Sequence, residues 1–161
     1  MSCFSPTENK DKLPNDAQLF HPVGNVCFND LLNKSAEAKK PLLLYFTSYS
    51  LRSTSKMEDY ILQNKVVIQK LKNDFIFVPL HLDNKEILPK SEWFYNNITH
   101  KTEKTIGQKY YRWQVEKFDT NAIPFFVILD EKGKKIKELT YTKDLLKFHD
   151  FFLESELKHI N

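Results

Sequence analysis

The sequence predicts a single α/β domain in which helices flank a central mixed sheet. Residues 42–46 form an apolar run of strand length, and a helical pattern follows this run after a short polar loop. Residues 74–82 are apolar nearly throughout, which is typical of a strand that is covered on both faces. A chain of 161 residues is long enough for one domain with a sizeable core.

The N-terminal segment differs in composition from the rest of the chain. Residues 1–22 are polar, contain several prolines and show little periodicity, so we expect a flexible lead-in. The predicted domain therefore spans residues 23–161. Its first elements are a short edge strand at residues 26–28 and a helix over about residues 29–39.

The helix after the central apolar run is expected to begin at Ser53. Ser53 and Thr54 are hydroxyl residues that can accept the first free backbone N–H groups of a helix. The helical pattern continues to about residue 73, and Asn64 marks a break within it.

The strand at residues 74–82 contains two residues that need a separate explanation. Pro79 is unusual inside a central strand because it cannot donate a ladder hydrogen bond. His81 is interpreted as a packed or rim residue, because no second histidine, cysteine or carboxylate lies at metal-ligand spacing.

Residues 83–106 are expected to form an insertion with little regular structure. Its aromatic cluster, residues 93–95, either lines a groove or pins the long loop to the domain, and pinning is favoured. The remaining predicted elements are a helix over about 107–118, an apolar strand before Asp130, a turn at Gly133, a strand at 135–140 and a terminal helix over about 143–158.

Two separated segments carry a recognisable pattern. In the first, an apolar strand leads through a Thr–aromatic loop to a Lys-Met-Glu triplet, which corresponds to residues 41–46, Thr47, Tyr49 and residues 56–58. The second consists of Gln114, Phe118, Asn121, Ala122 and Pro124, followed by an apolar strand and Asp130. Together the segments resemble the thioredoxin-fold family, in particular the C-terminal domain of the thiol:disulfide interchange protein DsbD. This resemblance covers about residues 26–161 and implies a thioredoxin-like fold.

The resemblance also implies that the reactive groups of the family are replaced. Leu51 and Thr54 occupy the positions of the two active-site cysteines, and Tyr45 occupies that of the acidic residue in the preceding strand. The Ile123–Pro124 bond is expected to be cis and to face this loop. Disulfide exchange requires an attacking thiolate and a resolving thiol, so no catalytic residue is assigned here.

The favoured hypothesis is a redox-inactive, thioredoxin-like protein that acts as a protein or peptide interaction module without a cofactor or metal. Its binding groove would combine the loop and helix start with the cis-proline segment. The residues of this predicted groove are Tyr49, Ser50, Leu51, Arg52, Ser53, Thr54, Ile123 and Pro124.

Two alternatives stay open at the level of the sequence. The first is a thiol–disulfide oxidoreductase that uses Cys3 or Cys27; we expect both to be free thiols, although an oxidising compartment would permit a disulfide. The second is a groove that has been repurposed for a ligand or another reaction. Arg52 and the nearby hydroxyls at a helix start would suit an anion.

The charge balance argues against nucleic acid as a partner. The chain has 24 Lys and Arg against 21 Asp and Glu, and only two of the basic residues are arginines, Arg52 and Arg112. No run reaches the length of a membrane span, and no apolar signal segment precedes the polar start. The resemblance implies the bacterial periplasm or cell envelope, with the cytoplasm as the alternative, and we expect a monomer.

Overall fold

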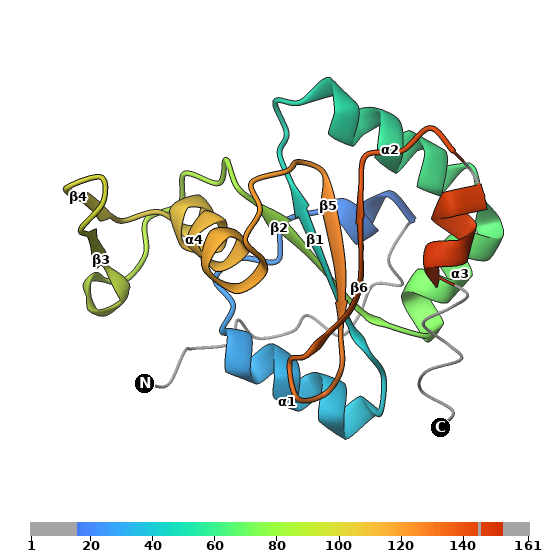
Figure 1. The fold of residues 1–161 in the computed structure, drawn as a ribbon, viewed down its shortest axis with the longest axis horizontal. Helices are drawn as coiled ribbons and strands as arrows, with labels where there is room; N and C mark the ends of the chain where they lie inside the picture. The colour runs from blue at the N-terminus through green and yellow to red at the C-terminus, as the bar shows by residue number, and fades with distance from the viewer. Residues whose placement is uncertain (1–15, 145, 153–161) are drawn as a thin grey trace.

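The computed structural model describes residues 16–144 and 146–152. Its central sheet has the strand order β2-β1-β5-β6 (Figure 1). The strands are β1 (Leu42–Thr47), β2 (Ile76–His81), β5 (Phe125–Leu129) and β6 (Lys135–Thr140). β1 pairs in parallel with β2 and antiparallel with β5, which confirms the predicted mixed sheet.

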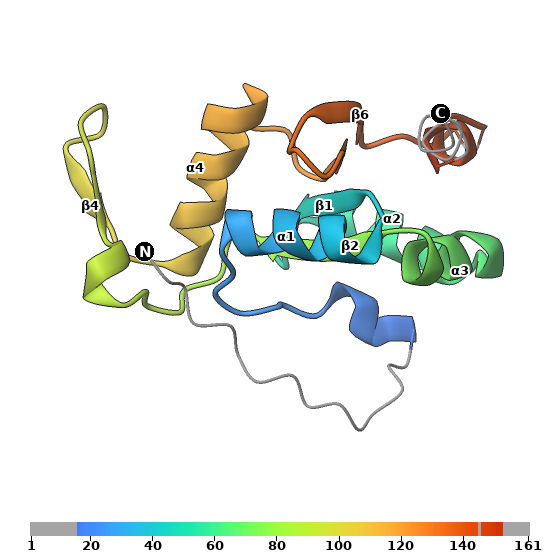
Figure 2. The same cartoon turned by 90° about the horizontal axis from the view of Figure 1, so that it is seen from below.

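Helices cover both faces of this sheet (Figures 1 and 2). α1 (Phe28–Ala38) and α4 (Ile106–Phe118) pack on one face. α2 (Arg52–Leu62), α3 (Lys65–Asn73) and the helical residues 146–152 pack on the other. Side chains of β1 alternate between the two layers: Leu44 and Phe46 face α1 and α4, whereas Leu43 and Tyr45 face α2 and α3.

Several boundaries differ from those that the sequence predicts. Residues 26–28 do not form a strand, because α1 already begins at Phe28. The predicted break near Asn64 is confirmed: Asn64 is the N-cap of α3, and its side-chain oxygen accepts a hydrogen bond from the Val67 N–H at 3.3 Å. The terminal helix is described over residues 146–152, and the remainder of the predicted helix lies outside the described residues.

The position of β2 explains its proline. β2 lies at the edge of the four-stranded sheet and pairs with β1 alone, with Pro79 opposite Tyr45. An edge strand needs ladder hydrogen bonds on one side only, so a residue without an N–H is tolerated there.

The insertion at residues 83–106 is more regular than expected. It contains the 3-10 helix η2 (Lys90–Glu92) and the hairpin of β3 (Phe94–Asn96) and β4 (Lys101–Glu103), which projects from the α4 side of the molecule in Figure 1. Trp93 pins the insertion, because its Nε1–H donates to the Leu88 carbonyl at 3.0 Å and its ring packs on the core. Lys109 of α4 adds a second attachment through the Glu92 carboxylate at 3.0 Å.

A close backbone approach fixes the start of α4 beside the end of β2. The Gly107 N–H donates to the Asn84 carbonyl at 3.0 Å. A Cβ atom at Gly107 would lie 2.3 Å from the Leu82 carbonyl oxygen. Glycine is therefore required at this position because no side chain fits between the helix and the turn.

Part of the predicted flexible lead-in is packed on the domain. Asp16–Phe20 forms the 3-10 helix η1, and Phe20 is 5% exposed. Its ring meets Tyr45 and Phe77 edge to face, with centroid separations of 5.9 Å in both cases. The packed structure therefore begins before residue 23; residues 1–15 lie outside the described residues.

No helix in the described part of the chain is long and apolar enough to cross a membrane.

The packing of Phe20 can be tested by Phe20→Ala. Removing a buried aromatic ring leaves a cavity between η1 and the sheet, so we expect a loss of about 3–5 kcal/mol in the free energy of unfolding. Urea denaturation measures this loss. The control is Ile98→Ala at a side chain that is 90% exposed, for which we expect a change within about 0.5 kcal/mol. Equal unfolding midpoints for the two variants would contradict the placement of η1 in the core.

Candidate functional site

The predicted groove lies where β1 ends and α2 begins. Residues 48–51 connect the two elements at the end of the sheet that also carries the turn after β2 (Figure 1). The Ile123–Pro124 peptide bond is cis, as the resemblance implies. Phe46 pairs with Phe125, so Pro124 comes next in the register and lies beside Thr47, at the start of the loop.

Asp83 holds this loop in place. Its Oδ2 accepts the Ser48 hydroxyl at 2.8 Å and the Ser50 N–H at 3.2 Å. The Ser48 and Ser50 hydroxyls also lie 2.9 Å apart. Burial acts to raise the pKa of Asp83, but the hydrogen bonds from Ser48 and from the loop backbone outweigh it and lower this pKa. The ionised carboxylate is therefore the form that stabilises the loop.

Tyr49 stacks on His81, with ring centroids 4.2 Å apart and an interplanar angle of 20°. His81 is buried at the end of β2, as the interpretation of a packed residue requires, and burial lowers its pKa despite the nearby Asp83 carboxylate. Tyr49 itself is 61% exposed. The stack therefore leaves one face of the Tyr49 ring open to solvent, while the other face packs on the imidazole ring.

Thr54 is buried and has a role different from the predicted one. Its hydroxyl donates to the Ser48 and Leu51 carbonyls, each at 2.7 Å. The N-cap of α2 is Leu51, which makes no side-chain capping bond. Ser53 and Thr54 are thus not caps; the helix begins one residue earlier, and the Thr54 hydroxyl ties the loop to the first turn of the helix.

A carboxylate lies beneath the loop even though β1 has none. Glu58 of α2 accepts the Tyr45 hydroxyl at 3.0 Å and the Thr47 hydroxyl at 3.2 Å. Burial raises the pKa of Glu58, and the two hydrogen bonds oppose this rise only in part. Burial together with the charge of Glu58 also raises the pKa of Tyr45, so Tyr45 remains a hydrogen-bond donor. The carboxylate nearest to Tyr45 among its hydrogen-bond partners is therefore Glu58, which belongs to the Lys-Met-Glu triplet of the matched pattern.

The predicted groove residues differ in their exposure. Tyr49, Ser50, Leu51 and Arg52 are exposed, Ser53 and Ile123 are half-buried, and Thr54 and Pro124 are buried. Ser48, Glu58 and Asp83 support the loop but were not predicted. Asp83 offered one signal, since a carboxylate directly after a strand parallel to β1 must reach the same end of the sheet.

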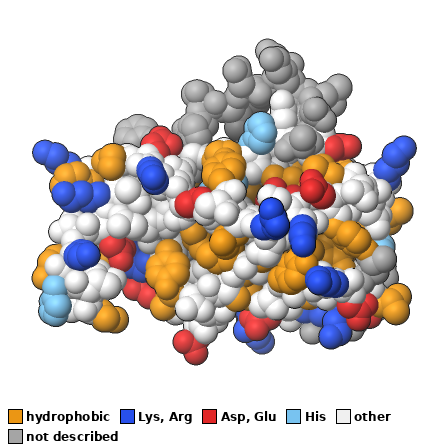
Figure 3. All heavy atoms as spheres, turned by 90° about the horizontal axis from the view of Figure 1, so that it is seen from above, with side chains coloured by type: hydrophobic (Ala, Val, Ile, Leu, Met, Phe, Trp, Pro, Cys, Tyr) orange, Lys and Arg blue, Asp and Glu red, His pale blue; other side chains and the backbone are white. Residues whose placement is uncertain are grey.

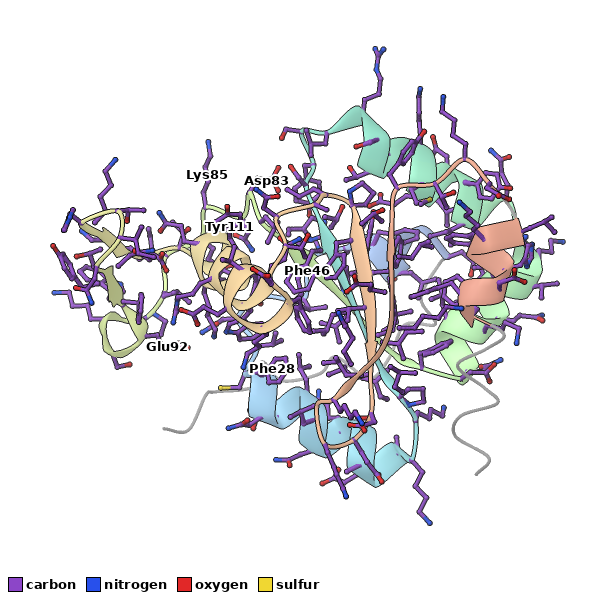
Figure 4. The ribbon with its side chains drawn as sticks, viewed as in Figure 1. Phe28, Phe46, Asp83, Lys85, Glu92 and Tyr111 are labelled. Carbon is purple, nitrogen blue, oxygen red and sulfur yellow. The ribbon has the colours of Figure 1, made fainter. Side chains whose placement is uncertain are left out.

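Cys27 does not belong to this site. It precedes α1 and is disulfide-bonded, so the expectation of a free thiol there is wrong; Cys3 lies outside the described residues. Phe28, the residue after Cys27, lies at the end of the sheet away from Asp83 in Figure 4. Within the described residues no cysteine lies near the loop, and no cluster of side chains could hold a metal ion.

The mixed sheet, its two helical layers and a cis-proline beside the loop between β1 and α2 define a thioredoxin-like fold. A family model described as a thioredoxin-like domain matches residues 28–146, and the chain belongs to this family.

Solved structures share the fold at low sequence identity. The DsbH oxidoreductase is 16% identical with a TM-score of 0.57, over 92% of this chain and 95% of that one. A thioredoxin from Thermus thermophilus is 16% identical with a TM-score of 0.56, over 82% and 85%. The C-terminal domain of DsbD from Neisseria meningitidis is 14% identical with a TM-score of 0.50, over 78% and 89%. No curated protein sequence matches significantly.

The half-buried Glu58 carboxyl predicts a specific dependence of stability on pH. Its pKa is raised in the folded protein, whereas the unfolded chain titrates near the ordinary value of 4.5. The folded state therefore holds this proton more tightly, and the free energy of unfolding falls as pH rises from below 4.5 through the raised pKa. Glu58→Gln cannot ionise and should lose this decline, so its stability relative to wild type should increase with pH.

Urea denaturation at a series of pH values from about pH 4 upward measures this effect, since the decline begins near the ordinary value of 4.5. Glu116→Gln is the control, because Glu116 is an exposed carboxylate on α4, on the other face of the sheet, and its replacement should leave the decline in place. An unchanged pH dependence in Glu58→Gln would show that Glu58 does not carry it.

The tie between Thr54 and the loop predicts a local effect on hydrogen exchange. Thr54→Val keeps the shape of the side chain but removes the donor, so the Ser48 and Leu51 carbonyls lose their partner. We expect a loss of about 1–2 kcal/mol in stability and faster amide exchange at residues 49–52. Thr54→Ser retains the hydroxyl and should keep the exchange of these amides close to wild type. Equal exchange in both variants would show that the hydroxyl does not hold the loop.

Proposed function

We propose that this protein is a redox-inactive member of the thioredoxin-like family that binds an extended protein or peptide segment at the cis-proline groove. The observation that carries the proposal is an exposed apolar loop beside an unpaired backbone segment. Tyr49 and Leu51 are 61% and 38% exposed. Among the described residues, neither the N–H nor the C=O of Ile123 has a hydrogen-bond partner.

These two features complement an extended chain. A strand that pairs with Ile123 would obtain backbone hydrogen bonds, as in other cases of strand addition. Its side chains would then meet Tyr49 and Leu51, where burial of apolar surface adds affinity. The rigid setting of Tyr49 on His81 reduces the entropy that the loop loses on binding.

The chemistry of the loop supports the absence of redox activity. Leu51 carries no nucleophile, and the Thr54 hydroxyl is buried and donates to two carbonyls. Among the described residues no base contacts that hydroxyl, so nothing activates it. Cys27 is disulfide-bonded, and its sequence neighbour Phe28 lies at the end of the sheet away from Asp83 in Figure 4, which disfavours the alternative of a dithiol cycle through this cysteine.

The hydroxyl groups of the loop do not favour a repurposed catalytic pocket. The Ser48 hydroxyl is buried and engaged with Asp83 and Ser50, and His81 stacks on Tyr49 rather than on a serine. Arg52 is exposed. An anion site at this helix start therefore has no organised support beyond the backbone.

We further propose that the protein acts as a monomer in the bacterial cell envelope, where redox homeostasis depends on relatives with this fold. The similarity to DsbH and to the DsbD domain supports this compartment, with the cytoplasm as the alternative. The low share of arginine disfavours nucleic acid as the partner. Fractionation of cells that express the full-length protein tests the compartment.

The binding proposal is tested with a random heptapeptide phage library as the probe. Peptides selected on the wild type should bind Tyr49→Ser/Leu51→Ser at least about tenfold more weakly by calorimetry, since two apolar contacts are lost. The control Val66→Ser/Ile98→Ser removes two exposed apolar side chains outside the groove and should bind normally. Failure to select any peptide, or equal binding by both double variants, would contradict the proposal.

A parallel assay tests the redox part. In insulin reduction with dithiothreitol, we expect no rate above that of Cys3→Ser/Cys27→Ser, and this variant should still bind the selected peptides. Turnover that is abolished by Cys27→Ser would show that the protein is an oxidoreductase.

A further inference from the structure

A pocket of about 210 Å³ lies between α2 and the segment that follows β6. In Figure 1 this segment passes from the end of β6 across to the side of the molecule that carries α2. The lining residues are Lys56, Met57, Tyr60, Tyr141, Thr142 and Lys143.

The strand register places this pocket next to the cis-proline groove. Phe125 pairs with Phe46 on one side and with Thr140 on the other. Pro124 is therefore flanked in register by Thr47 of β1 and by Tyr141, which lines the pocket. An extended peptide that pairs with Ile123, next to Pro124, would therefore place some of the peptide's side chains near Tyr141.

The polar groups of the pocket are mainly hydrogen-bond donors. The ammonium groups of Lys56 and Lys143 have no carboxylate partner among the described residues. The Thr142 hydroxyl already accepts the Asp144 N–H at 3.0 Å. The Tyr60 hydroxyl is buried and has no acceptor within the described part of the chain. A ligand that fits this pocket must therefore supply acceptor atoms and negative charge.

The carboxylate closest in sequence to Lys143 is engaged elsewhere. Asp144 Oδ1 accepts the Leu146 N–H at 3.0 Å and so serves the start of the next helix. The lining also includes the buried Met57 and two tyrosines, Tyr60 and Tyr141, which supply its apolar surface. On the face shown in Figure 3, basic side chains stand beside hydrophobic ones at the end that carries α2. An apolar floor with cationic groups beside it fits an aliphatic stem that ends in a carboxylate.

We propose that this pocket binds an acidic side chain, glutamate or aspartate, of the peptide that occupies the cis-proline groove. The inference rests on the proposed function and adds a sequence preference to it. Backbone pairing at Ile123 and apolar contacts at Tyr49 and Leu51 tolerate many sequences, whereas two unpaired ammonium groups select one charge. The pocket thus sets which extended segments the groove accepts.

The experiment compares peptides selected from the same heptapeptide library on the wild type and on Lys56→Gln/Lys143→Gln. We expect Asp or Glu at a constant position in the wild-type selection and the loss of this preference in the variant. The matched control, Lys132→Gln/Lys134→Gln, removes the same charge from the turn between β5 and β6 at the opposite end of the sheet and should keep the preference.

Calorimetry with synthetic peptides then isolates the charged contact. Replacing the selected Glu by Gln should weaken binding to the wild type about tenfold at low salt, and should have little effect on binding to Lys56→Gln/Lys143→Gln. Raising the ionic strength to about 0.5 M should reduce this difference, because the contact lies at the surface.

The outcomes separate this inference from the proposed function. The acidic-pocket inference is overturned if the selected peptides depend on Tyr49 and Leu51 but show no acidic preference. It is also overturned if the preference survives in Lys56→Gln/Lys143→Gln. Either outcome leaves the proposed groove intact. Failure to select any peptide overturns both. Binding of N-acetylglutamate as tightly as the peptide would assign the pocket to small carboxylates and would likewise overturn the inference.

Discussion

The burial of β1 on both faces is the constraint on which the rest of this structure depends. All six residues of the strand are buried, and the side chains of residues 42–46 enter two separate cores. A strand of this kind is stable only if helices cover both faces and strands pair on both edges. α1 and α4 supply one cover, α2 and α3 the other, and β2 and β5 provide the two neighbours.

The same strand determines where the candidate site lies. Because β1 and β2 run parallel, both end at the same edge of the sheet, which brings Asp83 to the loop after β1. The antiparallel pairing with β5 brings Pro124 to that edge from the opposite direction. The loop, the carboxylate that holds it and the cis-proline are therefore consequences of one set of strand pairings.

The side chains at the loop between β1 and α2 make structural contacts within the thioredoxin-like fold. Thr54 donates to backbone carbonyls, and Leu51 presents an apolar side chain to solvent. The half-buried Glu58 carboxylate accepts the hydroxyls of Tyr45 and Thr47. These contacts hold the loop in place, and they support our proposal of binding rather than catalysis at the groove.

The sequence by itself determined the order of the main strands and helices from residue 29 onward, outside the insertion, because hydrophobic period and turn residues are local signals. It did not predict η1 or the β3–β4 hairpin, and the strand that it predicted at residues 26–28 is absent. The break at Asn64 and the turn at Gly133, which has a φ of 83°, follow from single residues. That neither Leu51 nor Thr54 carries a thiol is likewise a property of the sequence alone.

Only the tertiary structure decided which distant groups meet. The bonds from Ser48 and Ser50 to Asp83, the stack of Tyr49 on His81 and the hydrogen bonds to Glu58 join residues from different elements. The packing of Phe20 on Tyr45 and Phe77 has the same origin, since a polar, proline-containing segment gives no local sign of one buried ring. Likewise, the sequence alone could not explain Pro79 inside a strand. The sheet order explains it, because β2 lies at an edge. These contacts depend on strand register and layer packing, and no local pattern in the chain encodes them.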